Sequence, residues 1–192
     1  MKTKGSVITG LLLAGVVSGT LVFQNNALAL KNKNAGEIVK RGEYLVNYGG
    51  CHDCHSPKIF TDKGPEPDFA RALSGYPAGT KLPEFPRNVI GPDKWGALTT
   101  NDLTAWFGPW GVSFAKNLTP DQETGLGGWS EKQFIDTMRT GKHLGNGREI
   151  LPPMPWFALA ALSDDDLKAI FAYLGTVPPI KNQVPDPLPP SE

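Results

Sequence analysis

The chain has 192 residues, of which 19 are basic and 19 acidic, so its formal net charge is zero. This balance gives no reason to expect nucleic acid or an anionic membrane surface as a partner. The chain also contains 18 prolines and 22 glycines, so long stretches should lack regular structure. Because such loops cost conformational entropy and bring little regular pairing, a large apolar ligand would help the chain to form a core.

The first 29 residues have the pattern of a secretory signal peptide. Lys2 and Lys4 precede an apolar run over 7–23, and a small-x-small cleavage site ends at Ala29. An uncleaved membrane anchor is the alternative, which the glycines within the apolar run weaken. The mature protein, residues 30–192, would be exported to the periplasm and have a net charge of −2.

The exported part is expected to form one domain. Residues 30–36 look like a flexible leader, and residues 37–180 are the predicted domain. Residues 181–192 form a proline-rich tail that lies extended over the surface or frays.

Hydrophobic spacing predicts helices in three places. The first runs from about Glu37 to Asn47 and stops at two glycines. The second follows a capping box made by Ser130 and Gln133 and ends at Gly141. The last is capped by Ser163 and ends at Gly175, with an apolar stripe of Leu167, Ile170, Phe171 and Leu174.

The stretch over 56–128 holds most of the glycine and proline punctuation. It predicts loops and short helical turns, with one turn of helix over 100–107. No alternating run is long enough to indicate a sheet. The fold class is therefore expected to be mainly α.

The only two cysteines, Cys51 and Cys54, are three residues apart, and His55 follows directly. A thioredoxin-type redox pair would need a preceding strand and a parallel sheet. A zinc site would need four ligands, and outside the motif only His143 remains among Cys and His. A structural disulfide is also conceivable in an exported protein.

Covalent attachment of c-type haem accounts for the third residue of the motif. Cys51 and Cys54 share one face of a helical turn, so both sulfurs can reach the vinyl groups at one porphyrin edge. His55 can then turn its imidazole towards iron, in the order Cys-x-x-Cys-His. His52, between the cysteines, points away from iron and is expected at the surface or behind the site.

The sixth iron ligand has three candidates. Met154 lies in the run LPPMPWF, where prolines exclude a helix and stiffen the backbone that carries the thioether. Met138 lies on the apolar face of a predicted helix, which indicates core packing. His143 lies among glycines and charges and is expected to be exposed, although ligation by two histidines stays open. Met154 is the predicted ligand.

The motif, the late Met154 and the closing helix together resemble the class I, mitochondrial-type cytochrome c fold. Residues 117–156 resemble the haem domains of bacterial cytochrome c subunits that serve membrane-bound alcohol and gluconate dehydrogenases. The resemblance covers 38–55 and 117–180, and it makes residues 56–116 a long irregular insertion between the haem motif and the capped helix.

The resemblance implies thioether attachment at Cys51 and Cys54, with His55 and Met154 as axial ligands of one haem c. The dehydrogenase subunits carry several haems, whereas this chain has one Cys-x-x-Cys-His motif. Trp129 and Arg139 lie near the matched region and could contact haem propionates, with a packed indole and a surface guanidinium as the alternative.

A proline carbonyl often accepts from the proximal imidazole in this fold, and Pro109 is the predicted acceptor. The sequence thus predicts an exported electron carrier, not an enzyme, with a six-coordinate His/Met iron. Its partners would be a dehydrogenase or quinol-oxidising complex as donor and an oxidase or another cytochrome as acceptor. Two alternatives stay open: a haem subunit of a membrane-associated dehydrogenase complex, and a gas-binding haem sensor whose sixth ligand detaches.

Overall fold

A computed structural model of the chain describes residues 33–84 and 87–190. The predicted signal peptide and its cleavage site lie outside these residues. The chain divides after Glu37 into two units, and the features below belong to the second, Ile38–Glu192, except for residues 33–37 at the start of the first helical segment. In the described part of the chain, every helix is too short or too polar to cross a membrane.

The N-terminal helical segment covers residues 33–48, so it begins four residues before the predicted start at Glu37. Its fully buried Val46 belongs to the main core. At Gly42 the segment meets helix α5 (Asp164–Leu174) almost backbone to backbone. A Cβ added at Gly42 would lie 1.9 Å from the carbonyl oxygen of Ala169. This helix crossing therefore requires a residue without a side chain.

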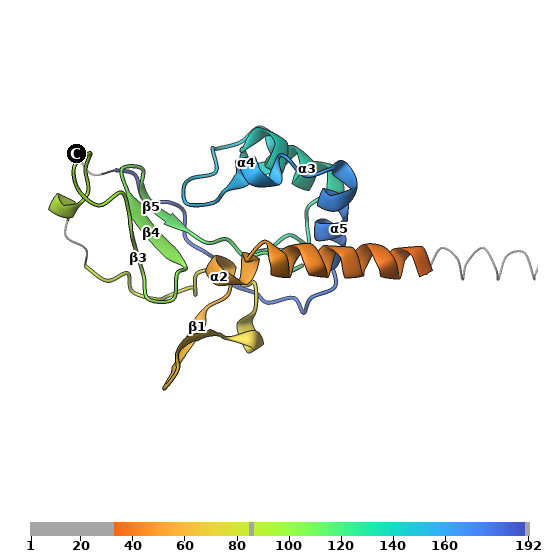
Figure 1. The fold of residues 1–192 in the computed structure, drawn as a ribbon, viewed down its shortest axis with the longest axis horizontal. Helices are drawn as coiled ribbons and strands as arrows, with labels where there is room; N and C mark the ends of the chain where they lie inside the picture. The colour runs from red at the N-terminus through yellow and green to blue at the C-terminus, as the bar shows by residue number, and fades with distance from the viewer. Residues whose placement is uncertain (1–32, 85–86, 191–192) are drawn as a thin grey trace, which may run out of the picture. The chain divides into compact units, whose positions relative to one another are not determined.

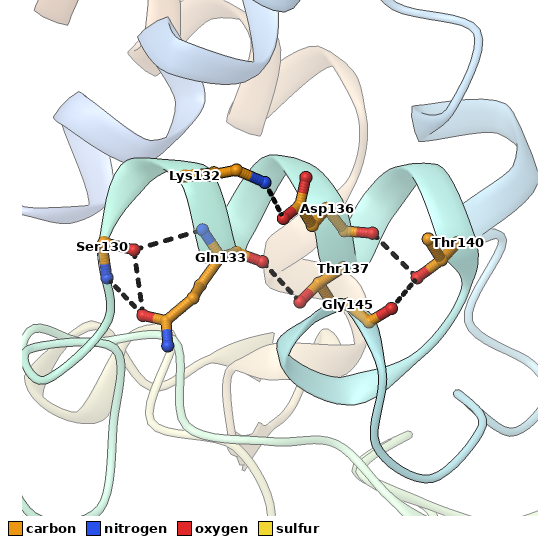
Figure 2. A network of polar contacts seen from close by, with 7 residues as sticks. All are labelled: Ser130, Lys132, Gln133, Asp136, Thr137, Thr140 and Gly145. Atoms are coloured by element: carbon orange, nitrogen blue, oxygen red, sulfur yellow. Dashed lines mark hydrogen bonds and ion pairs between the residues drawn. The ribbon is translucent and has the colours of Figure 1, made fainter.

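Helix α3 (Glu131–Thr140) confirms the predicted capping box. The Ser130 hydroxyl accepts a hydrogen bond from the Gln133 backbone N–H, and the Gln133 side chain accepts one from the Ser130 N–H at 2.9 Å (Figure 2). At the other end, the Thr140 hydroxyl donates to the carbonyl of Gly145 at 3.1 Å. This bond ties α3 to the short helix η3 (His143–Gly145) that follows it.

Helix α5 begins where predicted, because the Ser163 hydroxyl accepts from the Asp166 N–H. It packs on α3 and on the N-terminal helical segment, and the three surround the main core. The buried side chains of this core are Val46, Leu73, Leu126, Phe134, Met138, Leu167, Ile170 and Leu174. The predicted stripe of α5 thus lies in the core, with Phe171 at its margin.

The stretch after the cysteine motif contains two small antiparallel sheets, which the sequence analysis did not predict. Strands β1 (Lys58–Thr61) and β2 (Gly64–Pro67) form a hairpin; β3 (Leu98–Thr99), β4 (Ala105–Gly108) and β5 (Gly111–Phe114) form a sheet in that order. The helical turn expected over 100–107 is wrong, since β4 begins there. Strands of two to four residues are too short to show an alternating pattern.

The second core lies on the β3–β4–β5 sheet. It consists of the buried residues Tyr76, Ala105, Val112, Phe114 and Val184. Val184 comes from the C-terminal segment after α5, residues 176–190, which returns to the sheet beside β5 (Figure 1). There Val112 and Leu188 exchange two backbone hydrogen bonds of 2.9 Å. The tail was expected either to lie extended over the surface or to fray. As far as residue 190 it lies extended, and it is hydrogen-bonded to β5.

Two short 3₁₀ helices and two further α-helices complete the described elements. They are η1 (Phe69–Arg71), η2 (Arg87–Val89), α2 (Cys51–His55) and α4 (Trp156–Leu159). Helix α2 follows the N-terminal helical segment closely, and α4 follows the proline loop that contains Met154.

Candidate functional site

Helix α2 carries the whole Cys-x-x-Cys-His motif in little more than one turn. It is separated from the preceding helical segment by Gly50, whose φ of 65° is left-handed and favours glycine. Cys51 and Cys54 are both half-buried free thiols, and Cys51 packs against the main core. Burial raises the pKa of the Cys51 thiol to about 11 and also raises the pKa of Cys54. Neither cysteine is paired in a disulfide, and both thiols stay protonated at neutral pH because their pKa is raised.

The surroundings of these thiols do not support a zinc site or a thioredoxin-type redox pair. Among the described residues, no three His, Cys, Asp or Glu side chains come together as a metal cluster. The strand after the motif, β1, pairs only with β2 in an antiparallel hairpin. A zinc site lacks its ligand set in this part of the chain, and a thioredoxin-type pair lacks its parallel sheet.

The His55 imidazole is oriented by a backbone carbonyl from a distant part of the chain. Its Nδ1 donates to the carbonyl oxygen of Lys116 at 2.7 Å. Burial lowers the pKa of His55, and the Lys116 bond opposes this shift. A neutral ring that carries its proton on Nδ1 keeps Nε2 as a free lone pair, which is the form that binds iron. Pro109 as acceptor is wrong: it lies exposed between β4 and β5.

The Lys116 carbonyl is held by the segment over 73–76. Leu118 N–H donates to Leu73 O at 2.8 Å, and Tyr76 N–H donates to Ala115 O at 2.9 Å. These two bonds flank Lys116 on either side. The acceptor of the His55 proton is thus part of a short backbone ladder and cannot rotate freely.

The residues around α2 close its C-terminal end. The Lys58 ammonium donates to three carbonyls, those of His52, Asp53 and Ser56, at 3.1, 2.9 and 2.5 Å. Ser56 is fully buried; its hydroxyl accepts from Leu73 N–H and bonds Nδ1 of His52, both at 2.9 Å. The Ser56 hydroxyl thus links the His52 ring to the Leu73 backbone, so His52 supports the end of α2.

Met154 lies in the loop over 151–155, which leads into α4. Its side chain is partly buried. The loop is fixed to the sheet by Ser113 of β5, whose hydroxyl donates to the carbonyl of Pro152 at 2.5 Å. The Trp110 indole N–H in turn donates to Ser113 at 3.2 Å. The thioether is therefore carried by a backbone that is held on its sheet side.

The other end of this loop is fixed against α3. Trp156 N–H donates to Met154 O at 2.9 Å. The Trp156 ring covers Gly141, where an added Cβ would lie 2.5 Å from the indole. Gly141, which ends α3 at φ 66°, thus leaves room for the ring that follows Met154.

The donor set fits covalent haem. Two half-buried thiols share one turn, and the adjacent imidazole is neutral with Nδ1 engaged. Thiols in this order form the thioethers of c-type haem, and an imidazole nitrogen is a common axial ligand.

Proteins with related sequences are named as cytochrome subunits of dehydrogenases. The chain is 33% identical over 162 residues to the gluconate 2-dehydrogenase cytochrome c subunit of Pantoea cypripedii, which covers 84% of the chain. It is similar to bacterial dehydrogenase cytochrome c subunits. The cytochrome c subunit of alcohol dehydrogenase (quinone) from Gluconobacter oxydans (strain 621H) is 28% identical over 152 residues, or 78% of the chain. The fructose dehydrogenase cytochrome subunit of Gluconobacter japonicus is 33% identical over 85 residues, or 41%.

The chain spans only part of these cytochrome c subunits. The matches cover 27%, 24% and 17% of the gluconate, alcohol and fructose dehydrogenase subunits, respectively. No family model matches the chain. The individual relatives therefore show that this chain resembles the haem domains of cytochrome c subunits. The similarity covers about a quarter of the length of the gluconate and alcohol dehydrogenase subunits.

The other candidate ligands of this cytochrome-like chain have different surroundings. Met138 is buried in the main core between α3 and α5, which is the packing role that its helix position predicts. His143 is exposed, and its ring meets the Trp129 indole edge-on at 5.1 Å between centroids. Burial on one side lowers the pKa of His143, with nearby Arg148 and Lys116 acting in the same direction.

The two predicted propionate contacts lie in unlike places. Trp129 packs at the margin of the main core, against His143. The Arg139 guanidinium donates to the carbonyl of Ala160 and forms an ion pair with Asp164, both close together at the start of α5. Arg139 therefore closes the α3–α5 contact, and the propionate role remains a prediction for both residues.

The sequence did not reveal three positions that build this site: Lys116, Ser113 and Gly75, whose N–H donates to the carbonyl of His55 at 2.7 Å. Lys116 acts through its carbonyl, which every residue has, so no side-chain signal could reveal it. Ser113 is one hydroxyl in a strand that was itself not predicted. Gly75 alone had a weak signal, because it lies in the turn-like run SGYPAG.

A cavity of about 460 Å³ lies beside the exit from α2 but does not include the motif. Its lining comes from both sheets and the turns between them, with Lys58, Phe60, Arg71, Tyr76, Thr100 and Asp102 among its residues. Neither His55 nor Met154 contributes to it. The cavity is thus separate from the candidate haem site.

Proposed function

We propose that the chain is an exported, single-haem c-type cytochrome that carries one electron at a time between redox proteins. The observation that carries this proposal is the arrangement on α2: two free thiols followed by an imidazole whose Nδ1 proton is donated to Lys116. The similarity to cytochrome c subunits supports it independently. The presence of one Cys-x-x-Cys-His motif in the sequence supports a single haem.

Each residue of the site then has a defined role. Cys51 and Cys54 would form the two thioether bonds to haem, Nε2 of His55 would bind iron, and the Met154 sulfur would be the second iron ligand. A haem c held in this way supplies reversible one-electron chemistry at iron. The protein orients the imidazole through Lys116 and keeps the Met154 loop in place through Ser113.

Filled axial positions favour electron transfer over ligand binding. With both ligands in place, a small substrate has no coordination position to occupy. A carrier of this kind meets its donor and its acceptor through small, transient interfaces, below about 1,200 Å². If carbon monoxide binds the reduced protein at neutral pH, the gas-binding alternative is favoured instead.

A second candidate function is that of a haem subunit in a dehydrogenase complex. It is favoured by the relatives, whose names describe subunits of gluconate, alcohol and fructose dehydrogenases. In that case a dehydrogenase would be the electron donor and would stay bound. Co-purification of the tagged chain with a flavin or quinone subunit decides between a free carrier and a subunit.

The attachment residues are tested by expressing the full chain in a host that matures c-type cytochromes. The wild type should keep its haem through a denaturing gel, and the variant with Cys51→Ser and Cys54→Ser should lose it, because thioethers alone survive denaturation. Haem staining and the mass of the periplasmic protein make the measurement, and the mass also shows whether the chain begins at Leu30.

His52→Ala is the matched control, since His52 lies inside the motif but bonds Ser56 rather than the haem. This variant should retain covalent haem. Wild-type protein without covalently bound porphyrin would contradict the proposed function.

A further inference from the structure

The side-chain amide of Asn182, in the C-terminal segment, forms hydrogen bonds to the backbone of the turn over 74–78. Its Nδ2 donates to the carbonyls of Ser74 and Tyr76, at 2.7 and 2.9 Å. Its Oδ1 accepts from the Ala78 N–H at 2.8 Å. Both ends of the amide have partners of the complementary kind, so its orientation is determined by these three bonds.

Gly75 lies between the two carbonyls that Asn182 holds. Its N–H donates to the carbonyl of His55 at 2.7 Å. Its φ is 79°, and a Cβ added to it would lie 2.4 Å from Ala115 O and 2.8 Å from Lys116 O. The turn therefore touches both His55 and the backbone that accepts the His55 proton.

The segment that carries Asn182 is itself fixed to the rest of the chain. Asn182 N–H donates to the Thr124 hydroxyl at 3.0 Å. Two residues earlier, Ile180 N–H donates to the Thr119 hydroxyl at 3.1 Å. The Lys116 ammonium donates to Pro185 O at 2.8 Å, so the segment is also bound to Lys116. Because its own segment is held by these bonds, Asn182 can restrain the turn over 74–78.

We propose that Asn182 is a positioning residue for the His55 imidazole. By holding the 74–78 turn against the Ala115–Lys116 backbone, it keeps the Nδ1–H of His55 bonded to Lys116. A hydrogen bond at Nδ1 makes the ring a stronger electron donor at Nε2. Stronger donation favours the oxidised metal, so Asn182 lowers the reduction potential. This inference rests on the proposed function, because it requires His55 to be an iron ligand.

Asn182→Ala in the haem-loaded full chain tests this. The variant leaves two carbonyls and one N–H of the turn without their partner, so the Lys116 bond should loosen. The reduction potential should rise. In proton NMR of the reduced protein, the His55 Nδ1–H signal should move upfield, and its exchange with solvent should accelerate by about tenfold, the scale of a lost hydrogen bond.

Lys181→Ala is the matched control from the adjacent position. Its ammonium forms an exposed ion pair with Glu123 at 2.6 Å, away from the turn. This variant should keep both the wild-type potential and the wild-type exchange rate. If Asn182→Ala behaves in the same way as Lys181→Ala, the inference is overturned.

A measurement on the wild type covers the case in which Asn182→Ala does not fold. The amides of Gly75 and Ala78 and the Nδ1–H of His55 should exchange through one common opening, with the same dependence on denaturant. If the Nδ1–H of His55 exchanged with a different dependence on denaturant from the Gly75 and Ala78 amides, the inference would be overturned. Absence of covalent haem from the wild type would remove the proposed function instead, so the two failures are distinguishable.

Discussion

At the residue scale, the two axial candidates differ in how the chain holds them. His55 is bonded directly, through Nδ1, to a carbonyl of the backbone. Met154 is held indirectly, since the bonds are made by its own carbonyl and by that of Pro152. A thioether is a weak ligand, so if Met154 binds iron, its position depends on how firmly the loop is held. Met154 is thus the proposed ligand that substitution can test most directly.

Met154→Ala should convert the reduced protein from low-spin to a form that binds carbon monoxide. The reduction potential should fall, because thioether ligation favours the ferrous state. Visible spectra and a redox titration make the measurement.

The control for this change is Met138→Leu. Met138 is buried in the main core, and leucine preserves its volume, so spectrum and potential should stay as in the wild type. An unchanged low-spin spectrum and potential in Met154→Ala would move the ligand role to His143 or Met138.

At the scale of elements, the close helix crossing at Gly42 connects the Cys-x-x-Cys-His motif to α5. The helical segment over 38–48 leads directly to α2, so its position on α5 also determines where the cysteines lie. Beside the glycine, Arg41 and Asp166 form an ion pair of 2.8 Å. Because this pair is partly exposed, it contributes little, and close packing at Gly42 dominates the contact.

Gly42→Ala should lower the free energy of unfolding by about 1–3 kcal/mol, the usual cost of overpacking a core contact. The added methyl would lie 1.9 Å from Ala169 O, so the two helices must separate. Thermal and urea denaturation measure the change.

Gly36→Ala provides the comparison within the same run of helical residues. Nothing lies within 4 Å of a Cβ added at Gly36, so alanine should be neutral or stabilise the helix by up to about 1 kcal/mol. Equal stabilities of the two variants would mean that the Gly42 contact is not close in solution.

At the scale of the whole second unit, the C-terminal segment joins the two cores. Val177 packs against the main core, Val184 fills the core on the β3–β4–β5 sheet, and Leu188 pairs with β5. Between these residues, Asn117 donates to Ile180 O at 2.8 Å. The segment is therefore an integral part of the fold, although its proline-rich composition alone is also compatible with a frayed tail. The candidate site depends on both cores: α2 adjoins the main core through Cys51, and the Met154 loop is bonded to β5.

Ending the chain after Pro179 should lower the free energy of unfolding by on the order of 3–5 kcal/mol. The lost burial of Val184 accounts for about 1.5–3 kcal/mol, and the lost hydrogen bonds add to it, less the conformational entropy that the released residues no longer lose on folding. Denaturation of the haem-loaded protein measures the effect. Lys181→Ala, which removes only an exposed ion pair, should change stability by less than about 0.5 kcal/mol. A truncated chain as stable as Lys181→Ala would show that the segment is not an integral part of the fold.

The local features of this chain were predictable from sequence because each depends on near neighbours. The Ser130–Gln133 capping box and the Ser163 cap involve residues three apart. The buried stripe of α5 follows from its helical period. The Cys51–Cys54–His55 motif occupies little more than one turn, so its chemistry is also contained in five consecutive residues.

What the tertiary structure alone decided depends on contacts between distant residues. His55 is bonded to Lys116, 61 residues away, and Asn182 is bonded to Ser74, 108 residues away. Backbone carbonyls and short strands have no distinctive side-chain pattern, so neither the acceptor of the His55 proton nor the small sheets could be read from the sequence. The residue types of the site are therefore determined by the sequence itself. Their orientation is decided only by the folded chain, because the groups that orient them are brought together by folding.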